Sequence, residues 1–191
     1  MIKNNIRRES YLKFLNTWKN RDLIKVLSGV RRSGKSTLLA MFQQDLKEQG
    51  VQDENIIAIN FEYMEFEELT DYRKLHDYVL SKVDKNKKNY VFLDEIQHVQ
   101  NFEKVVDSLY IRDYIDLYIT GSNAFFLSGE LATLLTGRYI EQHVLPLSFQ
   151  EFKQWHTENN PTIQQLSNRD LYAMYTRSSF PYTLAMTNQQ E

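Results

Sequence analysis

The 191-residue sequence contains no cysteine, which excludes disulfide bonds and thiolate metal sites. None of the four histidines has the spacing of a metal-ligand pair, and we interpret all four as structural or surface residues. A dominant charge of one sign is also lacking, because the formal net charge is −2 and the pI is about 6.1. No overall basic field therefore favours nucleic acid, and only a local basic patch remains for such a partner.

Long apolar runs are missing as well. No segment approaches the ~20 residues needed to span a membrane, and residues 1–5 do not begin the apolar core of a signal peptide. We therefore expect a cytoplasmic protein without membrane contact. The length suggests one domain, or one domain plus the beginning of another, and 42% hydrophobic residues suffice for a core. We interpret the 12 Tyr and 11 Phe as core and half-buried sheet side chains rather than as a base-stacking platform.

Residues 29–37 (GVRRSGKST) fit the pattern G-x-x-x-x-G-K-[ST] of a phosphate-binding loop. Gly29 and Gly34 permit backbone angles that a side chain would forbid, so successive N–H groups can turn inward around a polyphosphate. Lys35 can reach the β- and γ-phosphates, and the Ser36 hydroxyl can ligate Mg²⁺. A chance match in a chain of this length is about a one-percent event at average glycine usage. The candidate nucleotide-binding residues are Gly29, Arg31, Arg32, Ser33, Gly34, Lys35, Ser36 and Thr37.

The context of this loop agrees with the motif. The apolar run 23–27 predicts a strand before it, and apolar residues at helical spacing over 36–49 predict a helix after it, with Gly50 as its stop. The amino end of that helix would point unsatisfied N–H groups and a positive dipole at the same anion. Further apolar, β-rich runs predict strands at 55–61, 90–94, 115–120 and 139–144.

Polar residues at the ends of two of these predicted strands, and one before a third, supply the remaining site candidates. Asp94 would hold Mg²⁺, and Glu95 could act as the general base that polarises an attacking water. Asn123 or Ser122, after the strand 115–120, could contact the γ-phosphate or its water. Arg138 is a candidate arginine finger, although a salt bridge at a loop end explains it equally well. Ligands bind at the carboxyl edge of an open α/β sheet, where the loop also emerges.

Helical spacing predicts helices at 8–18, 71–83, 101–112, 149–155 and 168–176, and the first begins at the second of two adjacent arginines. Asp71 or Thr70 can cap the second of these helices, and a capping box formed by Ser148 and Glu151 begins the fourth. Arg7 and Arg8 could meet a phosphate or the adenine face. We favour the simpler interpretation that they are solvated charges at a helix start.

Taken together, these segments resemble the ATPase domain of a family of AAA-type P-loop ATPases of bacteria and archaea. The resemblance covers roughly residues 6–185, and its motifs are GVRRSGKSTLL at 29–39, FLDEIQ at 92–97, TGSN at 120–123, LTGR at 135–138 and LPLSFQEF at 145–152. It implies a three-layer α/β/α fold with a mainly parallel five-stranded sheet, in which strand 115–120 lies between the loop strand and the acidic strand. It assigns Walker A to 29–36, Walker B to Asp94 and Glu95, and a sensor role to Asn123. It also suggests that Arg138 acts on the nucleotide of a neighbouring subunit, in a homo-oligomer.

Two departures from this family bear on domain organisation. Its members are usually about twice as long and continue into a poorly characterised C-terminal region that is sometimes considered nuclease-like or DNA-associated. Residues 178–181 (SSFP) stand where members tend to have GGFP. We therefore expect residues 1–150 to form the ATPase domain and residues 151–191 to be a helical segment that begins a truncated C-terminal region. Binding of nucleic acid would rest on that missing region.

Three functions fit these residues. The leading prediction is an ATP hydrolase that uses ATP and Mg²⁺, yields ADP and phosphate, and couples hydrolysis to conformational change. A nucleotide-dependent switch with slow hydrolysis would use the same residues. A small-molecule kinase is the third, but it needs an acceptor site and usually an arginine-bearing lid, and no such segment is evident.

Overall fold

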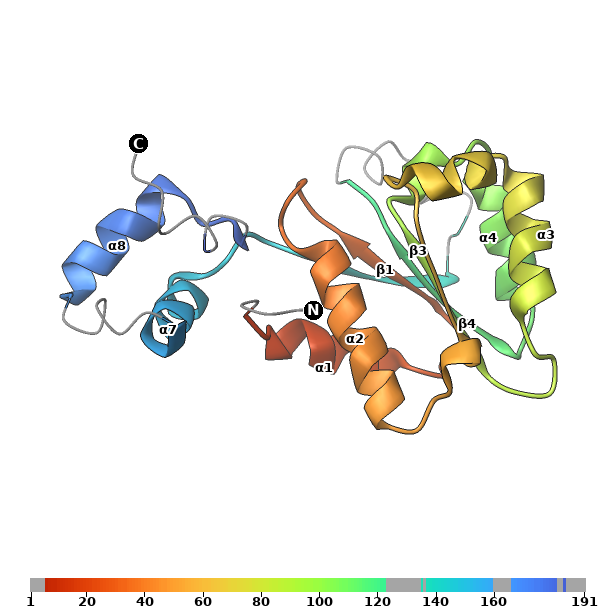
Figure 1. Cartoon of the computed structure of the whole chain (residues 1–191), viewed down its shortest axis with the longest axis horizontal. Coiled ribbons are helices and arrows are strands. Elements are labelled where there is room, and N and C mark those ends of the chain that lie inside the picture. Colours follow the sequence, from red (N-terminus) through yellow and green to blue (C-terminus); the bar gives the residue numbers. More distant parts are fainter. Residues whose placement is uncertain (1–5, 123–134, 136, 160–165, 182–183, 185–191) are drawn as a thin grey trace.

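A computed structural model describes residues 6–122, 135, 137–159, 166–181 and 184. Its centre is a parallel five-stranded sheet in the order β2-β3-β4-β1-β5 (Figure 1). The strands are β1 Ile24–Ser28, β2 Ile56–Asn60, β3 Asn89–Asp94, β4 Ile115–Thr120 and β5 Tyr139–His143. Each lies within a residue or two of its predicted range. The expected fold class is confirmed, because β4 lies between the loop strand β1 and the acidic strand β3.

Helices cover both faces of the sheet, which gives the three layers (Figure 1). On one face lie α1 Glu9–Trp18 and α2 Lys35–Glu48, and on the other lie α3 Tyr72–Lys82 and α4 Phe102–Tyr110. Short 3-10 segments complete this body: η1 Asp53–Asn55, η2 Met64–Thr70 and η3 Ile96–His98. Asp71 caps α3 as predicted, because its side chain accepts hydrogen bonds from the N–H groups of Arg73 and Lys74.

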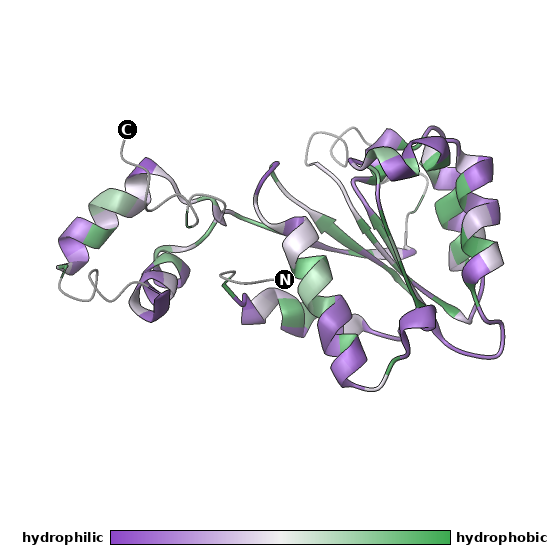
Figure 2. Ribbon diagram, in the orientation of Figure 1, coloured by the Kyte–Doolittle hydropathy of each residue, from purple (hydrophilic) through white to green (hydrophobic). Residues whose placement is uncertain are grey.

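The two faces of the strands bury two separate cores, because successive side chains of a strand point to opposite faces. Val26 and Leu93 pack toward Leu75 of α3 and Val106 of α4. On the other face, Leu27, Phe92 and Tyr118 pack toward α1 and α2. Figure 2 shows both hydrophobic and hydrophilic residues on each of these helices, as expected for helices with one buried face.

The aromatic residues serve this second core. The rings of Phe92 and Tyr118 stack with centroids 4.7 Å apart, and Phe42 of α2 lies 5.3 Å from Tyr118. All three side chains are buried, so here the interpretation of aromatics as core residues is right.

Two further helices, α7 Phe149–Asn159 and α8 Asn168–Arg177, lie beyond β5 and away from the sheet (Figure 1). The predicted capping box begins α7: the Ser148 N–H donates to Glu151, and the Glu151 N–H donates to Ser148 Oγ. A small apolar cluster joins α7 to the start of the chain, since Ile6 packs with Phe152 and Trp155. Because α7 begins at Phe149, this helix crosses the expected boundary at residue 150, and the division into two domains stays a prediction.

No helix within the described part of the chain is both long enough and apolar enough to cross a membrane.

Candidate functional site

The phosphate loop leaves the carboxyl end of β1 and enters α2 at Lys35. Gly29 and Gly34 have φ of 146° and 99°, in the region that favours glycine. A Cβ on Gly29 would lie 2.3 Å from the carbonyl oxygen of Val144, which no rearrangement of a side chain could relieve. Gly29 is therefore required both by its conformation and by the strand segment beside it.

The interior of this loop contains polar groups suited to an anion. The Ser33 hydroxyl is fully buried, and among the described residues its Oγ has no hydrogen-bond partner. Lys35 is also buried, and its ammonium contacts the carbonyl oxygens of Gly29 at 3.2 Å and Val30 at 3.4 Å. A buried hydroxyl without a partner is costly unless a ligand or water satisfies it. The residues therefore fit a polyphosphate.

The acidic end of β3 meets the loop directly. Lys35 Nζ lies 3.3 Å from Glu95 Oε1, and both side chains are largely buried. The Ser36 side chain lies close enough to the Asp94 carboxyl to oppose the rise of its pKa. These two contacts bring together four of the predicted site residues from two separate segments of the chain.

Two polar side chains hold Asp94 by hydrogen bonds. The Thr120 hydroxyl donates to Asp94 Oδ1, and the Asn60 amide donates to Oδ2 at 2.9 Å. Burial raises the pKa of the Asp94 carboxyl, although the hydrogen bond from Thr120 and the nearby Ser36 side chain oppose this rise. The carboxylate is thus oriented toward Ser36 in an environment where a cation would favour its ionised form.

Glu95 has an unusual backbone conformation. Its φ of 58° is left-handed, which is uncommon for a residue other than glycine. Its N–H donates to Thr120 Oγ1 at 2.9 Å, and its carboxylate accepts from the Gln97 side-chain amide. Such strain costs on the order of 1–3 kcal/mol and is frequent at functional sites. Here it turns the Glu95 side chain toward Lys35.

Mg²⁺ fits the pair of Ser36 and Asp94. This ion usually keeps several waters and takes one or two protein ligands together with substrate phosphates. Among the residues that the structure describes, no group of three or more histidine and acidic side chains could hold a metal by itself. The donor set therefore suits an ion that arrives with a nucleotide.

The other predicted loop residues lie on its outer side or in α2. Arg31 is exposed and pairs with Glu62 at 2.9 Å. Arg32 is exposed and has a left-handed φ of 67°, and Thr37 lies half-buried in the first turn of α2. Asn123, the candidate sensor, lies outside the described residues, so its role stays a prediction.

Arg138 lies at the amino end of β1, whereas the phosphate loop follows the carboxyl end of that strand. Its carbonyl accepts a hydrogen bond from the N–H of Ile24, the first residue of β1, and the loop follows the last residue of the same strand. At about 3.3 Å per residue, the two ends of β1 are roughly 15 Å apart. Its guanidinium forms an ion pair with Asp107 of α4 at 2.8 Å. Arg138 therefore does not reach the nucleotide site of its own chain, and action on a neighbouring subunit stays a prediction.

Several site residues were missed from the sequence. Asn60 and Thr120 end their strands at the same edge as Asp94, so the position of polar residues at strand ends could have identified both. The expectation that Arg8 is a solvated charge is wrong, because Arg8 is only 5% exposed. Its guanidinium contacts residues far away in the sequence, and no local pattern indicates them.

Comparison with known proteins agrees with this geometry. A family model described as an AAA domain matches residues 21–153. An uncharacterized protein of Haemophilus influenzae is 44% identical over 183 residues, which cover 95% of this chain and 45% of that protein. The chain spans less than half the length of the curated relatives it matches.

Solved structures share the fold at low sequence identity. The Walker-type ATPase of Pyrococcus abyssi matches with a TM-score of 0.62 at 17% identity, over 96% of this chain and 68% of that one. AMPPCP-bound DnaA from Aquifex aeolicus matches with a TM-score of 0.61 at 13% identity, over 97% of this chain and 62% of that one. The family model, which matches more than half of the chain, shows that the chain belongs to the AAA domain family, and the solved structures share its fold.

Proposed function

We propose that this domain binds ATP with Mg²⁺ and hydrolyses it to ADP and phosphate. The observation that carries the proposal is the contact between Lys35 Nζ and Glu95 Oε1, at 3.3 Å. It places the carboxylate that we expect to act as general base beside the ammonium that we expect to bind the β- and γ-phosphates.

Each residue has a distinct role in this reaction. The N–H groups of the loop and of the first turn of α2 bind the phosphates, and Lys35 neutralises their charge. Glu95 accepts the proton of a water whose oxygen forms a bond to the γ-phosphorus, while the bond from that phosphorus to the bridging oxygen of ADP breaks. Ser36 and Asp94 would hold Mg²⁺, which withdraws charge from the phosphate oxygens. Thr120 holds Asp94 and the Glu95 backbone in register.

A phosphate-release assay on the full-length protein tests the proposal. We expect Mg²⁺-dependent turnover that Glu95→Gln lowers by about 10²- to 10⁴-fold, the usual contribution of a positioned general base. Glu62→Gln is the matched control, because Glu62 is a more exposed glutamate that pairs with Arg31 on the outside of the loop. Wild-type protein that binds ATP but shows no such turnover would contradict hydrolysis and favour a nucleotide switch. Phosphate transfer to a sugar or nucleoside in place of water would favour a kinase.

What hydrolysis drives is a second part of the proposal. The longer relatives contain sequence beyond the part that this chain matches, and we propose that hydrolysis changes the conformation of such a region. The contacts of α7 with the start of the chain support a mechanical connection. Limited proteolysis of the full-length protein with ATP and with ADP would detect a difference between the two states.

Nucleic acid is proposed as a partner of that further region and not of the site itself. A filter-binding titration of the full-length protein at two salt concentrations tests it, because phosphate contacts weaken as salt rises. Retention that does not change with salt would contradict the proposal.

A further inference from the structure

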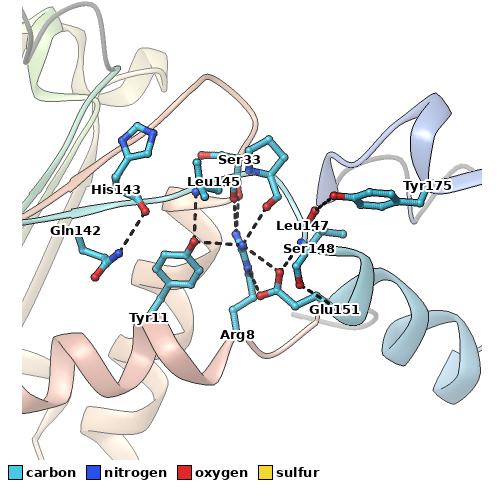
Figure 3. A network of polar contacts seen from close by, with 11 residues as sticks. Arg8, Tyr11, Ser33, Gln142, His143, Leu145, Leu147, Ser148, Glu151 and Tyr175 are labelled. Atoms are coloured by element: carbon cyan, nitrogen blue, oxygen red, sulfur yellow. Dashed lines mark hydrogen bonds and ion pairs between the residues drawn. The ribbon is translucent and has the colours of Figure 1, made fainter. Parts of the chain in front are cut away.

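Arg8 is a buried arginine at the amino end of α1, and its guanidinium joins three segments of the chain (Figure 3). Nη1 donates to the carbonyl oxygen of Ser33, inside the phosphate loop, at 3.2 Å. The same nitrogen donates to the carbonyl oxygen of Leu145 at 2.8 Å, and Nη2 donates to that of Pro146 at 3.2 Å. Nε lies 2.8 Å from Glu151 Oε1, in the first turn of α7. The loop, the segment after β5 and α7 therefore share one side chain.

The contact with Ser33 determines how the loop presents its N–H groups. In a trans peptide the carbonyl oxygen and the following N–H point in opposite directions, and the structure contains no cis peptide among the described residues. The Ser33 carbonyl points toward Arg8, so the N–H of Gly34 points away from Arg8. This N–H is one of the groups that a phosphate-binding loop aims at its anion.

The position of Arg8 is itself held firmly. The guanidinium carbon lies 4.4 Å from the centre of the Tyr11 ring, and the Tyr11 hydroxyl accepts a hydrogen bond from the Leu145 N–H. A second bond joins Nη2 to Glu151 Oε2 at 3.2 Å. A planar guanidinium can make all of these contacts at once, and a lysine ammonium cannot.

Glu151 is suited to anchor this arginine. Burial raises the pKa of its carboxyl, but the hydrogen bonds from Arg8 and from the Ser148 N–H outweigh burial and hold the pKa below its ordinary value. The carboxylate is therefore ionised at neutral pH. Its Oε2 accepts a hydrogen bond from the Ser148 N–H at the start of α7, and both of its oxygens accept hydrogen bonds from Arg8.

We propose that Arg8 is a positioning residue for the phosphate loop, and that Glu151 connects the geometry of this loop to the first turn of α7. The proposal rests on the proposed nucleotide binding, because its effect is on phosphate-bearing ligands. It predicts that a change at α7 alters nucleotide affinity without any contact between α7 and the phosphates.

Arg8→Lys is the informative variant, because it keeps the charge beside Glu151 and removes the fork of donors. We expect it to weaken binding of ADP and ATP by about tenfold, as for the loss of a hydrogen bond from a charged donor. Arg7→Lys is the matched control: Arg7 is the neighbouring arginine, is half-exposed, and pairs with Glu9 and Asp45 instead of the loop. Glu151→Gln should weaken binding by about threefold, since the bond to Ser33 remains while its anchor loses charge.

Titration with a fluorescent ADP analogue gives the affinities, and deuterium exchange of the peptide that contains residues 29–37 reports the loop itself. Without ligand, exchange of that peptide should be faster in Arg8→Lys than in wild type and unchanged in Arg7→Lys. Equal affinities of the Arg8 and Arg7 variants would overturn the proposal. A changed unfolding rate of Arg8→Lys with unchanged deuterium exchange of residues 29–37 would also overturn it, because Arg8 would then be merely structural.

The two proposals can fail separately. If wild-type protein does not bind the nucleotide analogue, the proposed function is wrong, while loop exchange in Arg8→Lys still tests the contact with Ser33. If wild-type protein binds it and Lys35→Ala abolishes binding, but Arg8→Lys changes neither affinity nor exchange, only the role of Arg8 is wrong. If Arg8→Lys does not fold, Glu151→Gln decides, because unchanged affinity and exchange in that variant contradict the connection to α7.

Discussion

Lys35 of the phosphate loop and Glu95 at the end of β3 form a buried ion pair, with 3.3 Å between Nζ and Oε1. The phosphates of a nucleotide would compete with this carboxylate for Lys35. The strained backbone of Glu95 and its bonds to Thr120 and Gln97 hold the carboxylate there. Nucleotide binding would therefore require Lys35 to separate from Glu95, whereas hydrolysis would require the Glu95 carboxylate to stay at the site.

This competition predicts that Glu95→Gln binds ATP more tightly than wild type does. The variant frees Lys35 and removes a negative charge beside the triphosphate, so we expect roughly three- to tenfold lower Kd, as for about 1 kcal/mol of charge interaction. Equilibrium titration in the absence of Mg²⁺, where turnover does not interfere, measures it. Glu62→Gln serves as the control, and weaker binding by Glu95→Gln than by that control would contradict the prediction.

The raised pKa of Asp94 predicts a pH-dependent stability. Burial, the largest cause, makes the folded carboxyl take up a proton at a higher pH than the unfolded one, whose ordinary value is 3.8. The contribution of Asp94 to stability is thus complete below pH 3.8 and is lost as pH rises through the raised pKa. We expect the free energy of unfolding of wild type, minus that of Asp94→Asn, to fall as pH increases from about 4 to 7.

Urea unfolding of the ligand-free proteins across this range measures the difference. Asp113→Asn is the control, because Asp113 is exposed. A difference for Asp94 that stays constant, or that increases with pH, would show that burial does not dominate its titration.

Gly29→Ala should destabilise the protein more than Gly50→Ala does. Both glycines have positive φ, but an added Cβ meets the Val144 carbonyl oxygen at 2.3 Å in the first case and nothing within 4 Å in the second. The backbone strain is common to both, and the clash adds about 1–3 kcal/mol at Gly29. Thermal or urea unfolding compares the two variants, and equal losses of stability would contradict the close approach of Val144.

Arg138 acting in trans predicts complementation between two inactive variants. Arg138→Ala keeps Glu95, and Glu95→Gln keeps Arg138, so a mixed oligomer of full-length chains would contain complete sites and regain ATP turnover. Asp107→Ala is the matched control, because it breaks the same ion pair while leaving Arg138 in place, and its turnover should stay near that of wild type. Wild-type turnover by Arg138→Ala alone would show that Arg138 is only the partner of Asp107.

Local patterns in the sequence determined the helices and strands of the sheet domain, the phosphate loop and the acidic residues of the site. The glycines of the loop, the alternation of apolar residues in strands and the acids after β3 each depend on neighbours in the chain, and all lie where their patterns predicted. The expected order of the strands came from the resemblance to AAA-type ATPases, because periodicity alone does not tell which strands are neighbours. The structure agrees with that order.

Only the tertiary structure decided which polar residues support the site. Asn60 and Thr120 bind Asp94 because their strands end beside β3, and Lys35 meets Glu95 because the loop strand and the acidic strand flank β4. Arg8 illustrates the limit most clearly: next to a helix start a charge is ordinarily solvated, yet here it is buried against Glu151, 143 positions away. Local conformational preference depends on adjacent residues, whereas burial and ion pairing depend on how distant elements pack together.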